Sequence, residues 1–292
     1  MPERGSPTVR RRRLGYELRQ LREAVGKTGE EAALALGWSD SKISRIETGR
    51  IGVTWGDVSD LLDLYGVTDP GVRDPLISLA REARQQGWWH PYSNLLGRPY
   101  ATYIGLETAA ESLRLFEPLT VPGLLQTELY AHVIIRTSTR ELGRDEIERR
   151  VEVRLRRQDV IFKSEDPLRL NVVLDEAVLR RETGGPATMA GQVRRLIEAS
   201  AHPRVRVQVL TFAQGQHVGM AGSFGVFSFP GEPGGDIGFV DTMAGSLFIE
   251  RQAEVAAARD AFEELSAQAL SREDTIALLT EVAAGYQRRC KE

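Results

Sequence analysis

The pattern of apolar and polar residues predicts five helices between residues 14 and 86. The first segment repeats its apolar residues every three or four positions, as a helix with one buried face requires: Leu14, Leu18, Leu21 and Val25. Two short segments follow, between residues 28 and 37 and between residues 39 and 49, and two more run over about 54–65 and 70–86. We expect an all-α N-terminal domain over residues 14–86, preceded by a disordered basic arm over residues 1–13.

The second and third segments carry the end signals of short helices. Thr28 stands three residues before Glu31, which is a capping-box pattern, and Gly37 can adopt the positive φ that ends a helix. Ser39 can cap the third segment. Two short helices joined by a glycine-containing turn indicate a helix-turn-helix, in which the second helix enters the major groove of DNA.

The third segment has side chains suited to reading bases. Ile43 and Ile46 must face the interior of the domain. The other face then offers four polar side chains to base edges: Asp40, Ser41, Lys42 and Arg45. Contacts to phosphates are expected from helix N-termini and nearby cations, and the candidate residues are Thr28, Ser39, Arg50, Arg12 and Arg13.

From residue 87 to residue 292 the pattern becomes mixed. Helices are expected at 103–116, 124–137, 143–163, 186–201 and 253–269. β-branched and aromatic residues predict strands at 170–174, 205–210, 224–229 and 237–240. The fold class is therefore α+β: an all-α five-helix domain followed by a mixed α/β C-terminal domain that would sense a signal, bind a partner and dimerise.

Aromatic and histidine residues suggest a ligand or partner surface in the second domain, and the candidates are Trp88, Trp89, His90, Tyr92 and His217. For the aromatic residues we favour packing between the domains, with a pocket wall or a dimer contact as the alternative. The loop at 213–222 can be a lid over an effector or an ordinary surface connection. These alternatives stay open.

Basic and acidic residues are distributed unevenly along the chain. Residues 1–50 carry 11 Lys and Arg against 7 Asp and Glu, while the remaining residues carry 27 against 34. A basic end suits the approach to a polyanion, although a solvated surface explains it equally well. The single cysteine, Cys290, argues against a disulfide framework or a Cys-rich zinc site. No apolar run is long enough to span a membrane and no secretory signal is visible, so we expect a cytoplasmic protein without a metal or cofactor.

A catalytic interpretation has little support. His217, Asp241 and Ser223 invite a triad, but Ala221 replaces the first glycine that a Gly-x-Ser-x-Gly elbow would need. We therefore do not expect an enzyme.

Residues 14–66 resemble the Xre/phage-repressor helix-turn-helix family. The resemblance rests on the run Lys42-Ile43-Ser44-Arg45-Ile46-Glu47-Thr48-Gly49-Arg50 together with Thr28, Glu31, Ala33 and Gly37. It implies that Arg22 pairs with Glu47 and that Asp40, Ser41 and Arg45 contact bases. Gly29 departs from the family, in which a glutamine commonly opens the second helix and touches phosphate.

The later residues, from Gly87-Trp88-Trp89-His90 through Pro122-Gly123-Leu124-Leu125-Gln126-Thr127 to residues 174–181 and 210–228, resemble a set of actinobacterial Xre regulators with a C-terminal domain of uncertain function. We expect a transcription regulator that binds double-stranded DNA as a homodimer, because one short helix reads too few bases. We expect its C-terminal domain to respond to a small-molecule effector or a small protein partner. An antitoxin-like protein that acts mainly through a small partner protein is the alternative function.

Overall fold

The structure is a computed structural model that describes residues 6–138, 142–229, 231, 235–242 and 245–291. The chain forms two compact units. The N-terminal unit comprises Met1–Pro91, Ala101–Ala109 and Phe229–Gly235, and the C-terminal unit comprises Tyr92–Tyr100, Ala110–Ser228 and Asp236–Glu292. In the described part of the chain no helix combines the length and the apolar character needed to cross a membrane.

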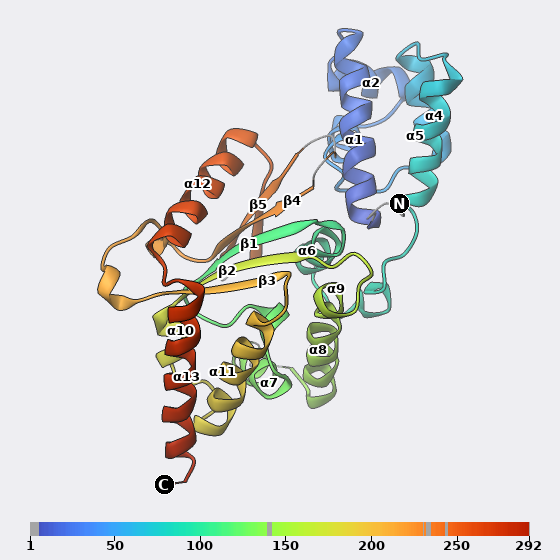
Figure 1. Cartoon of the computed structure of the whole chain (residues 1–292). Coiled ribbons are helices and arrows are strands. Elements are labelled where there is room, and N and C mark those ends of the chain that lie inside the picture. The colour runs from blue at the N-terminus through green and yellow to red at the C-terminus, as the bar shows by residue number, and fades with distance from the viewer. Residues whose placement is uncertain (1–5, 139–141, 230, 232–234, 243–244, 292) are drawn as a thin grey trace. The chain divides into compact units, whose positions relative to one another are not determined.

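The N-terminal unit contains the five predicted helices (Figure 1): α1 (Pro7–Ala24), α2 (Gly29–Leu36), α3 (Asp40–Glu47), α4 (Trp55–Leu64) and α5 (Pro70–Glu82). Most of α6 (Arg98–Ala109) belongs to the same unit. The helices enclose one apolar core whose fully buried residues include Leu14, Leu18, Ile43, Leu61 and Leu62. The predicted all-α N-terminal domain is confirmed.

The predicted arm is wrong for residues 7–13, which form the first turns of α1. Ser6 caps this helix by accepting a hydrogen bond from Val9 N at 3.3 Å, and Pro7 suits the first helical position. Thr8 is buried against α6, where a Cβ at Gly105 would come within 2.7 Å of Thr8 Cβ. Tertiary packing thus orders a stretch with too few apolar residues to show a helical pattern. Residues 1–5 of the arm lie outside the described residues.

The C-terminal unit is built on a six-stranded mixed sheet with the order β3-β2-β1-β4-β5-β6. Its strands are β1 (Ser112–Glu117), β2 (Arg169–Asp175), β3 (Val205–Leu210), β4 (Phe224–Ser228), β5 (Ile237–Thr242) and β6 (Gly245–Ile249). β1, β2 and β3 are parallel, and β4 runs antiparallel to β1. The mixed α/β C-terminal domain is therefore confirmed.

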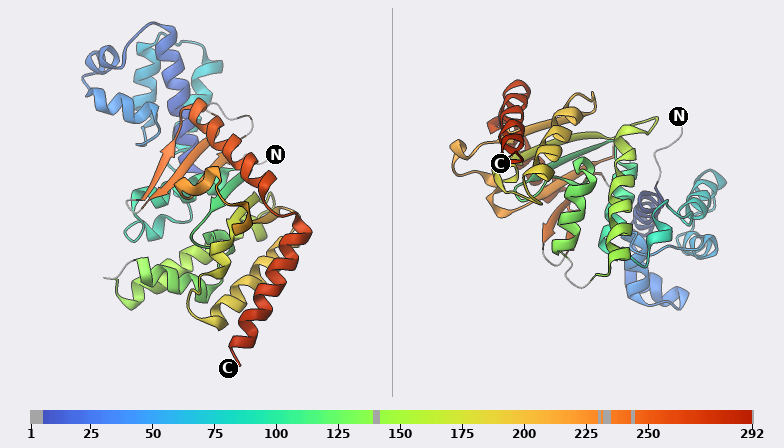
Figure 2. Two further views of the ribbon diagram at one scale, coloured as in Figure 1. Left: turned by 90° about the vertical axis from the view of Figure 1, so that its left-hand side faces the viewer. Right: turned by 90° about the horizontal axis from the view of Figure 1, so that it is seen from below.

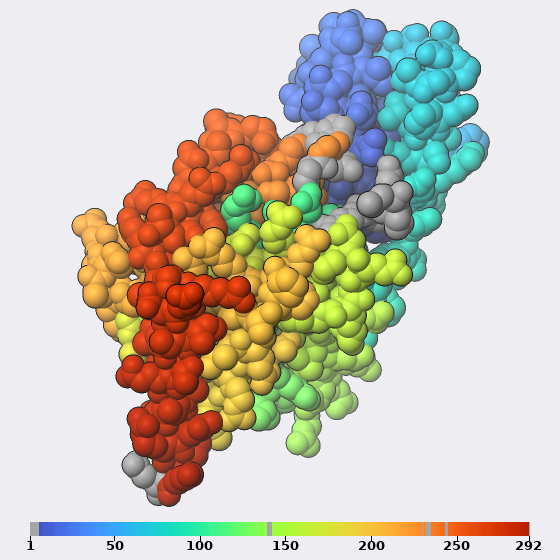
Figure 3. All heavy atoms as spheres, viewed as in Figure 1, coloured from blue at the N-terminus to red at the C-terminus, as the bar shows by residue number. Residues whose placement is uncertain are grey.

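Helices cover both faces of this sheet. α12 (Gln252–Gln268) packs on one face through Phe262 and Leu265, which contact Phe116 of β1. The other side carries α7 (Glu128–Ser138), α8 (Arg144–Arg157), α11 (Pro186–Ser200) and α13 (Arg272–Arg289), with the short α9 (Asp159–Phe162) and α10 (Glu176–Arg180) nearby (Figure 2). On the face seen in Figure 3, α12 and α13 form part of the outer surface of this unit.

The sequence-based assignment is wrong in places. The helix predicted at 103–116 ends at Ala109, and residues 112–116 belong to β1, an interior strand of the sheet. The helix predicted at 143–163 is divided at Gln158 into α8 and α9. Neither β6 nor α13 was predicted.

Candidate nucleic-acid interface

The third helix has a strongly two-sided surface. Ile43 and Ile46 are 1% and 2% exposed and anchor α3 in the core of the N-terminal unit. Ser39 precedes the helix, but its hydroxyl hydrogen-bonds Ser41 Oγ at 3.1 Å and does not cap the backbone. The backbone N–H groups at the start of α3 therefore lack a side-chain cap from Ser39, as in a helix end that can receive an anion.

An ion pair fixes the other end of α3 to α1. Arg22 Nε donates to Glu47 Oε1 at 2.6 Å and Nη2 to Oε2 at 2.9 Å, while Nη1 donates to Lys27 O at 2.5 Å. The side chains of both partners are about one-tenth exposed. The hydrogen bond to Glu47 raises the pKa of Arg22. Burial, together with Glu47, raises the pKa of neighbouring Tyr65 to about 12. The structure thus brings together the two residues that the family resemblance pairs.

Two glycines allow α1 and α3 to approach closely. A Cβ at Gly15 would lie 2.6 Å from the carbonyl oxygen of Glu47. A Cβ at Gly49, which has a φ of 64°, would lie 2.8 Å from Arg12 Cα. Arg12 therefore lies against the turn that follows α3. The Gly15 contact could not be predicted from the sequence, because it depends on where two helices cross.

The outward face of α3 presents Asp40, Ser41, Ser44 and Arg45, all of which are exposed. Arg45 lies along its own helix, with Nε donating to Ser41 O at 2.9 Å. Ser44 was not among the predicted base-reading residues. A helical projection could have found it, because it lies next to Ser41 and opposite the two buried isoleucines.

Lys42 occupies a different place from the one predicted. Its Nζ contacts Asp57 Oδ1 at 2.9 Å and lies 3.3 Å from the ring centroid of Trp38. Asp57 also completes the capping box of α4 with Thr54. Lys42 lies at the border between the buried and the exposed face of α3, so its long side chain reaches α4. Its ion pair with Asp57 holds α3 in place.

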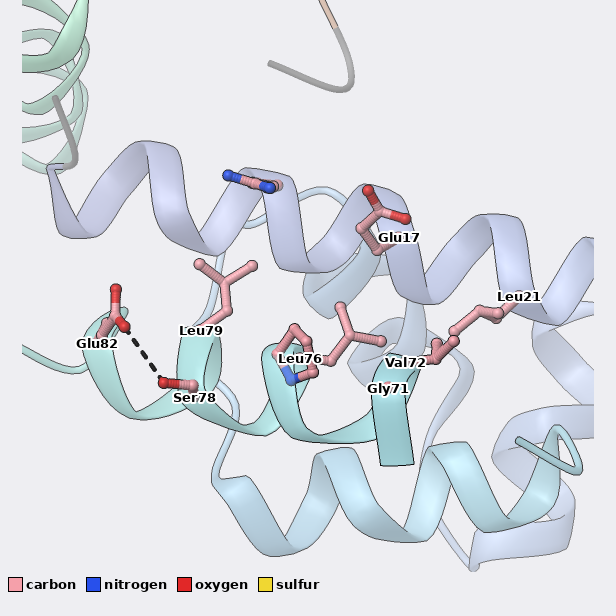
Figure 4. Close-up of a pocket in the computed structure, with 10 residues that line it drawn as sticks. Glu17, Leu21, Gly71, Val72, Leu76, Ser78, Leu79 and Glu82 are labelled. Carbon is pink, nitrogen blue, oxygen red and sulfur yellow. Dashed lines mark hydrogen bonds between the residues drawn. The ribbon is translucent and has the colours of Figure 1, made fainter. Parts of the chain in front are cut away.

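The predicted phosphate-contacting residues are spread over several elements. Thr28 caps α2 by accepting from Glu31 N at 3.1 Å, while Ser39 and Arg50 are exposed near the two ends of α3. Arg13 lines a groove of about 420 Å³ between α1 and α5 (Figure 4), together with Glu17, Leu21, Val72 and Leu76 among others. No residue of α3 lines this groove.

A hollow of about 450 Å³ lies beside α3, and its lining includes Gly29, Asp40, Ser44 and Glu47. A Cβ at Gly29 would meet only Ile43 Cγ2, at 3.8 Å. The position that carries glutamine in the family thus leaves open space next to the outward face of α3.

The aromatic candidates belong to both units. Trp89 is buried, with its ring edge-on to Trp88 at 6.0 Å and close to Gly105 of α6. His90 is exposed. Tyr92 belongs to the C-terminal unit, where its hydroxyl donates to Glu152 at 2.8 Å. Trp89 is therefore a packing residue of the N-terminal unit.

His217 lies near the carboxyl ends of β1 and β2 in the C-terminal unit. Its Nε2 is 3.7 Å from Asp175 Oδ2, and its ring is 5.8 Å from that of Phe116. Asp241 accepts a hydrogen bond from Ser246 instead, so His217, Asp241 and Ser223 do not form the considered triad. Within the described residues, no three His, Cys, Asp or Glu side chains are placed to hold a metal ion.

Comparison with known families accounts for most of the chain. Residues 13–76 match a family model described as a helix-turn-helix domain, which indicates DNA binding and transcription regulation. Residues 100–281 match the model of a domain of unknown function, DUF5753. No curated protein and no solved structure gave a significant match. Because the second model covers more than half of the chain, the protein belongs to the DUF5753 family, with a helix-turn-helix domain preceding the family domain.

Proposed function

We propose that the protein is a sequence-specific transcription regulator of the Xre type that binds its operator as a homodimer. The observation that carries the proposal is the fixed and two-sided α3: the Arg22–Glu47 pair and the buried isoleucines anchor it, and its polar face stays exposed. A helix held in this way can enter the major groove without reorganising. Two copies are needed because one short helix reads too few bases.

In this proposal Arg45, Ser41 and Asp40 contact base edges, and Ser44 joins them. Lys42 is left out because its charge is paired with Asp57. Arg50, Ser39 and the N-termini of α2 and α3 supply the phosphate contacts, and Arg12 helps to position the turn after α3. Binding to chromosomal DNA implies a cytoplasmic location.

The C-terminal domain would then control the DNA-binding domain through an effector. Control by a small protein partner, as in an antitoxin-like protein, is the second candidate. It is favoured by three exposed apolar side chains around the β3–β4 connection: Phe212, Val218 and Met220, which are 59%, 45% and 70% exposed. Co-purification of a second chain that is lost when Phe212 and Met220 are both replaced by serine would support this candidate.

The direct test is capture of genomic fragments by the purified full-length protein over a series of salt concentrations, followed by sequencing. We expect enrichment of a short inverted repeat that persists at moderate salt. Binding without sequence preference that disappears steeply with salt would contradict the proposal, because it would reflect phosphate contacts alone.

Arg45→Ala tests the placement of the recognition helix. It should weaken binding to the enriched repeat by about 1–3 kcal/mol, the cost of one lost base contact. Arg149→Ala, which removes the same charge from an exposed position on α8, should leave the affinity unchanged. Equal affinities for the wild type and Arg45→Ala would show that α3 does not read the bases through this residue.

A further inference from the structure

A row of polar side chains crosses the sheet of the C-terminal unit at the edge where the parallel strands end. The pairing of β1 with β4 and of β4 with β5 places three residues side by side: Glu117 at the end of β1, Ser223 directly before β4, and Asp241 on β5. Asp241 N donates to Ser223 O at 3.3 Å, and the hydroxyl of Ser246 on β6 donates to the Asp241 carboxylate. We call these four residues the polar row.

The polar row faces away from α12. Phe116 packs against α12, and successive residues of a strand point to opposite faces, so Glu117 points to the other face. Arg154 of α8 lies close enough to lower the pKa of Glu117. The row is buried at Ser223, partly exposed at Glu117 and exposed at Asp241, so it is open to solvent at one end.

Two polar atoms beside Glu117 have no hydrogen-bond partner. They are Ser223 Oγ and Arg154 Nε, two of the four buried side-chain atoms in this condition among the described residues. Ser223 is only 7% exposed, and although its hydroxyl lies near enough to lower the pKa of Glu117, it makes no hydrogen bond of normal geometry. Leaving such a group unpaired costs about 1–3 kcal/mol, so two at one place point to a ligand.

The electrostatics of the row favour a cation. Burial, with a further contribution from Asp241, raises the pKa of Glu117 to about 8. At neutral pH the carboxyl group is therefore mostly protonated. A positive charge placed between Glu117 and Asp241 would stabilise the ionised form of Glu117. The pKa of Glu117 would then fall and its proton would be released.

We propose that the polar row binds the ammonium group of a small amine-containing molecule, with Glu117, Ser223 and Asp241 as acceptors. An ammonium group has three donors, which matches these three side chains. Arg154 Nε offers a donor to an acceptor on the same molecule, as the carboxylate of an amino acid would provide. A metal ion fits less well, because the described residues offer no group of three His, Cys, Asp or Glu ligands.

The position in the fold agrees with this proposal. In open α/β sheets ligands bind outside the carboxyl ends of the strands, where successive connections leave in different directions. Here β2 lies on one side of β1 and β4 on the other, and Glu117 ends β1 at that point. That amine binding would control DNA binding rests on the proposed function. Amine binding itself can be measured without DNA.

The test is the melting temperature of the full-length protein at pH 7.5 with a panel of L-amino acids and their N-acetyl derivatives, at matched ionic strength. At ten times Kd, we expect at least one free amine to raise the melting temperature by about 3–6 °C and its acetylated form to have no effect. Glu117→Gln and Ser223→Ala should abolish the rise. Glu198→Gln, an exposed position on α11, should keep it.

Calorimetry on the wild type in two buffers of different ionisation enthalpy provides a second readout that needs no variant. Binding at pH 7.5 should release protons, because the raised pKa of Glu117 keeps part of its carboxyl group protonated in the free protein. No stabilisation by any amine, equal stabilisation by an acetylated form, persistence of the effect in Glu117→Gln or binding without proton release would each overturn the proposal. DNA capture by the wild type tests the proposed function and does not depend on any of these four results. A failure of the amine site can therefore be told apart from a failure of the proposed function.

Discussion

At the scale of single residues, two ion pairs of the N-terminal unit position α3. Glu47 is held by Arg22 from α1, and Lys42 is held by Asp57 from α4. Each pair joins α3 to a different helix. Polar contacts to α1 and α4 therefore hold α3 in place in addition to its buried apolar face. Of the two cations of α3, Arg45 is the one that faces outward.

Removing Glu47 should therefore destabilise the N-terminal unit. Glu47→Ala leaves the Arg22 guanidinium nearly buried without its carboxylate, and we expect a loss of about 2–4 kcal/mol in the free energy of unfolding. Tryptophan fluorescence during urea denaturation measures this, because all four tryptophans belong to the N-terminal unit. Arg22→Met combined with Glu47→Leu should recover part of the loss, since neither charge then remains. An unchanged midpoint for Glu47→Ala would contradict the prediction.

At the scale of elements, the sequence predicted helices well where the end signals are local. Thr28 with Glu31, and Gly37 after the last apolar position, define α2 by contacts within a few residues, and the structure has these contacts. β1 could not be found in this way. Four of its six residues are buried because β2 and β4 flank them, and those strands lie about 57 and 110 positions further along the chain. Non-local pairing overrides a helical pattern that continues from α6.

The candidate site shows the same limit. Ser41 and Arg45 could be placed from helical periodicity, because their position opposite Ile43 and Ile46 decides their exposure. Lys42 could not, because its contact with Asp57 depends on where α4 crosses α3. The polar row was not predicted either, since it joins four neighbouring strands whose register the sequence does not reveal.

Two glycine substitutions in neighbouring helices should have opposite effects. Gly29→Ala places a Cβ in open space at the start of α2, so we expect a gain of about 0.4–1 kcal/mol in the free energy of unfolding. Gly15→Ala would force α1 away from the carbonyl groups at the end of α3, and a loss of about 1–3 kcal/mol is expected. Fluorescence-monitored urea denaturation compares them. Effects of the same sign would show that helix propensity, and not the contact between α1 and α3, decides the outcome.

At the scale of the whole molecule, the two units differ in how pH should affect them. The excess of basic residues lies within the first 50 positions, whereas Glu117, the carboxyl group with the pKa raised to about 8, lies in the C-terminal unit. The pKa of Arg22 is raised, so its guanidinium stays charged through neutral pH. A pH dependence around neutrality is therefore expected from the C-terminal unit.

Glu117 should make this unit less stable as pH rises. Its pKa is about 8 in the folded protein and 4.5 in an unperturbed side chain, so between these values the folded state binds more protons than the unfolded state. Stability should therefore fall with rising pH across this range, by up to about 1.4 kcal/mol per pH unit, and level off above pH 8. Glu117→Gln removes the titration, so its advantage over the wild type should be small near pH 5 and grow up to pH 8. Scanning calorimetry from pH 5.5 to 8.5 measures the difference, with Glu198→Gln as the matched control. Parallel curves for Glu117→Gln and the wild type would mean that Glu117 is ionised in the folded protein throughout this range, and the polar row would then hold two negative charges that only a bound cation or Arg154 could offset.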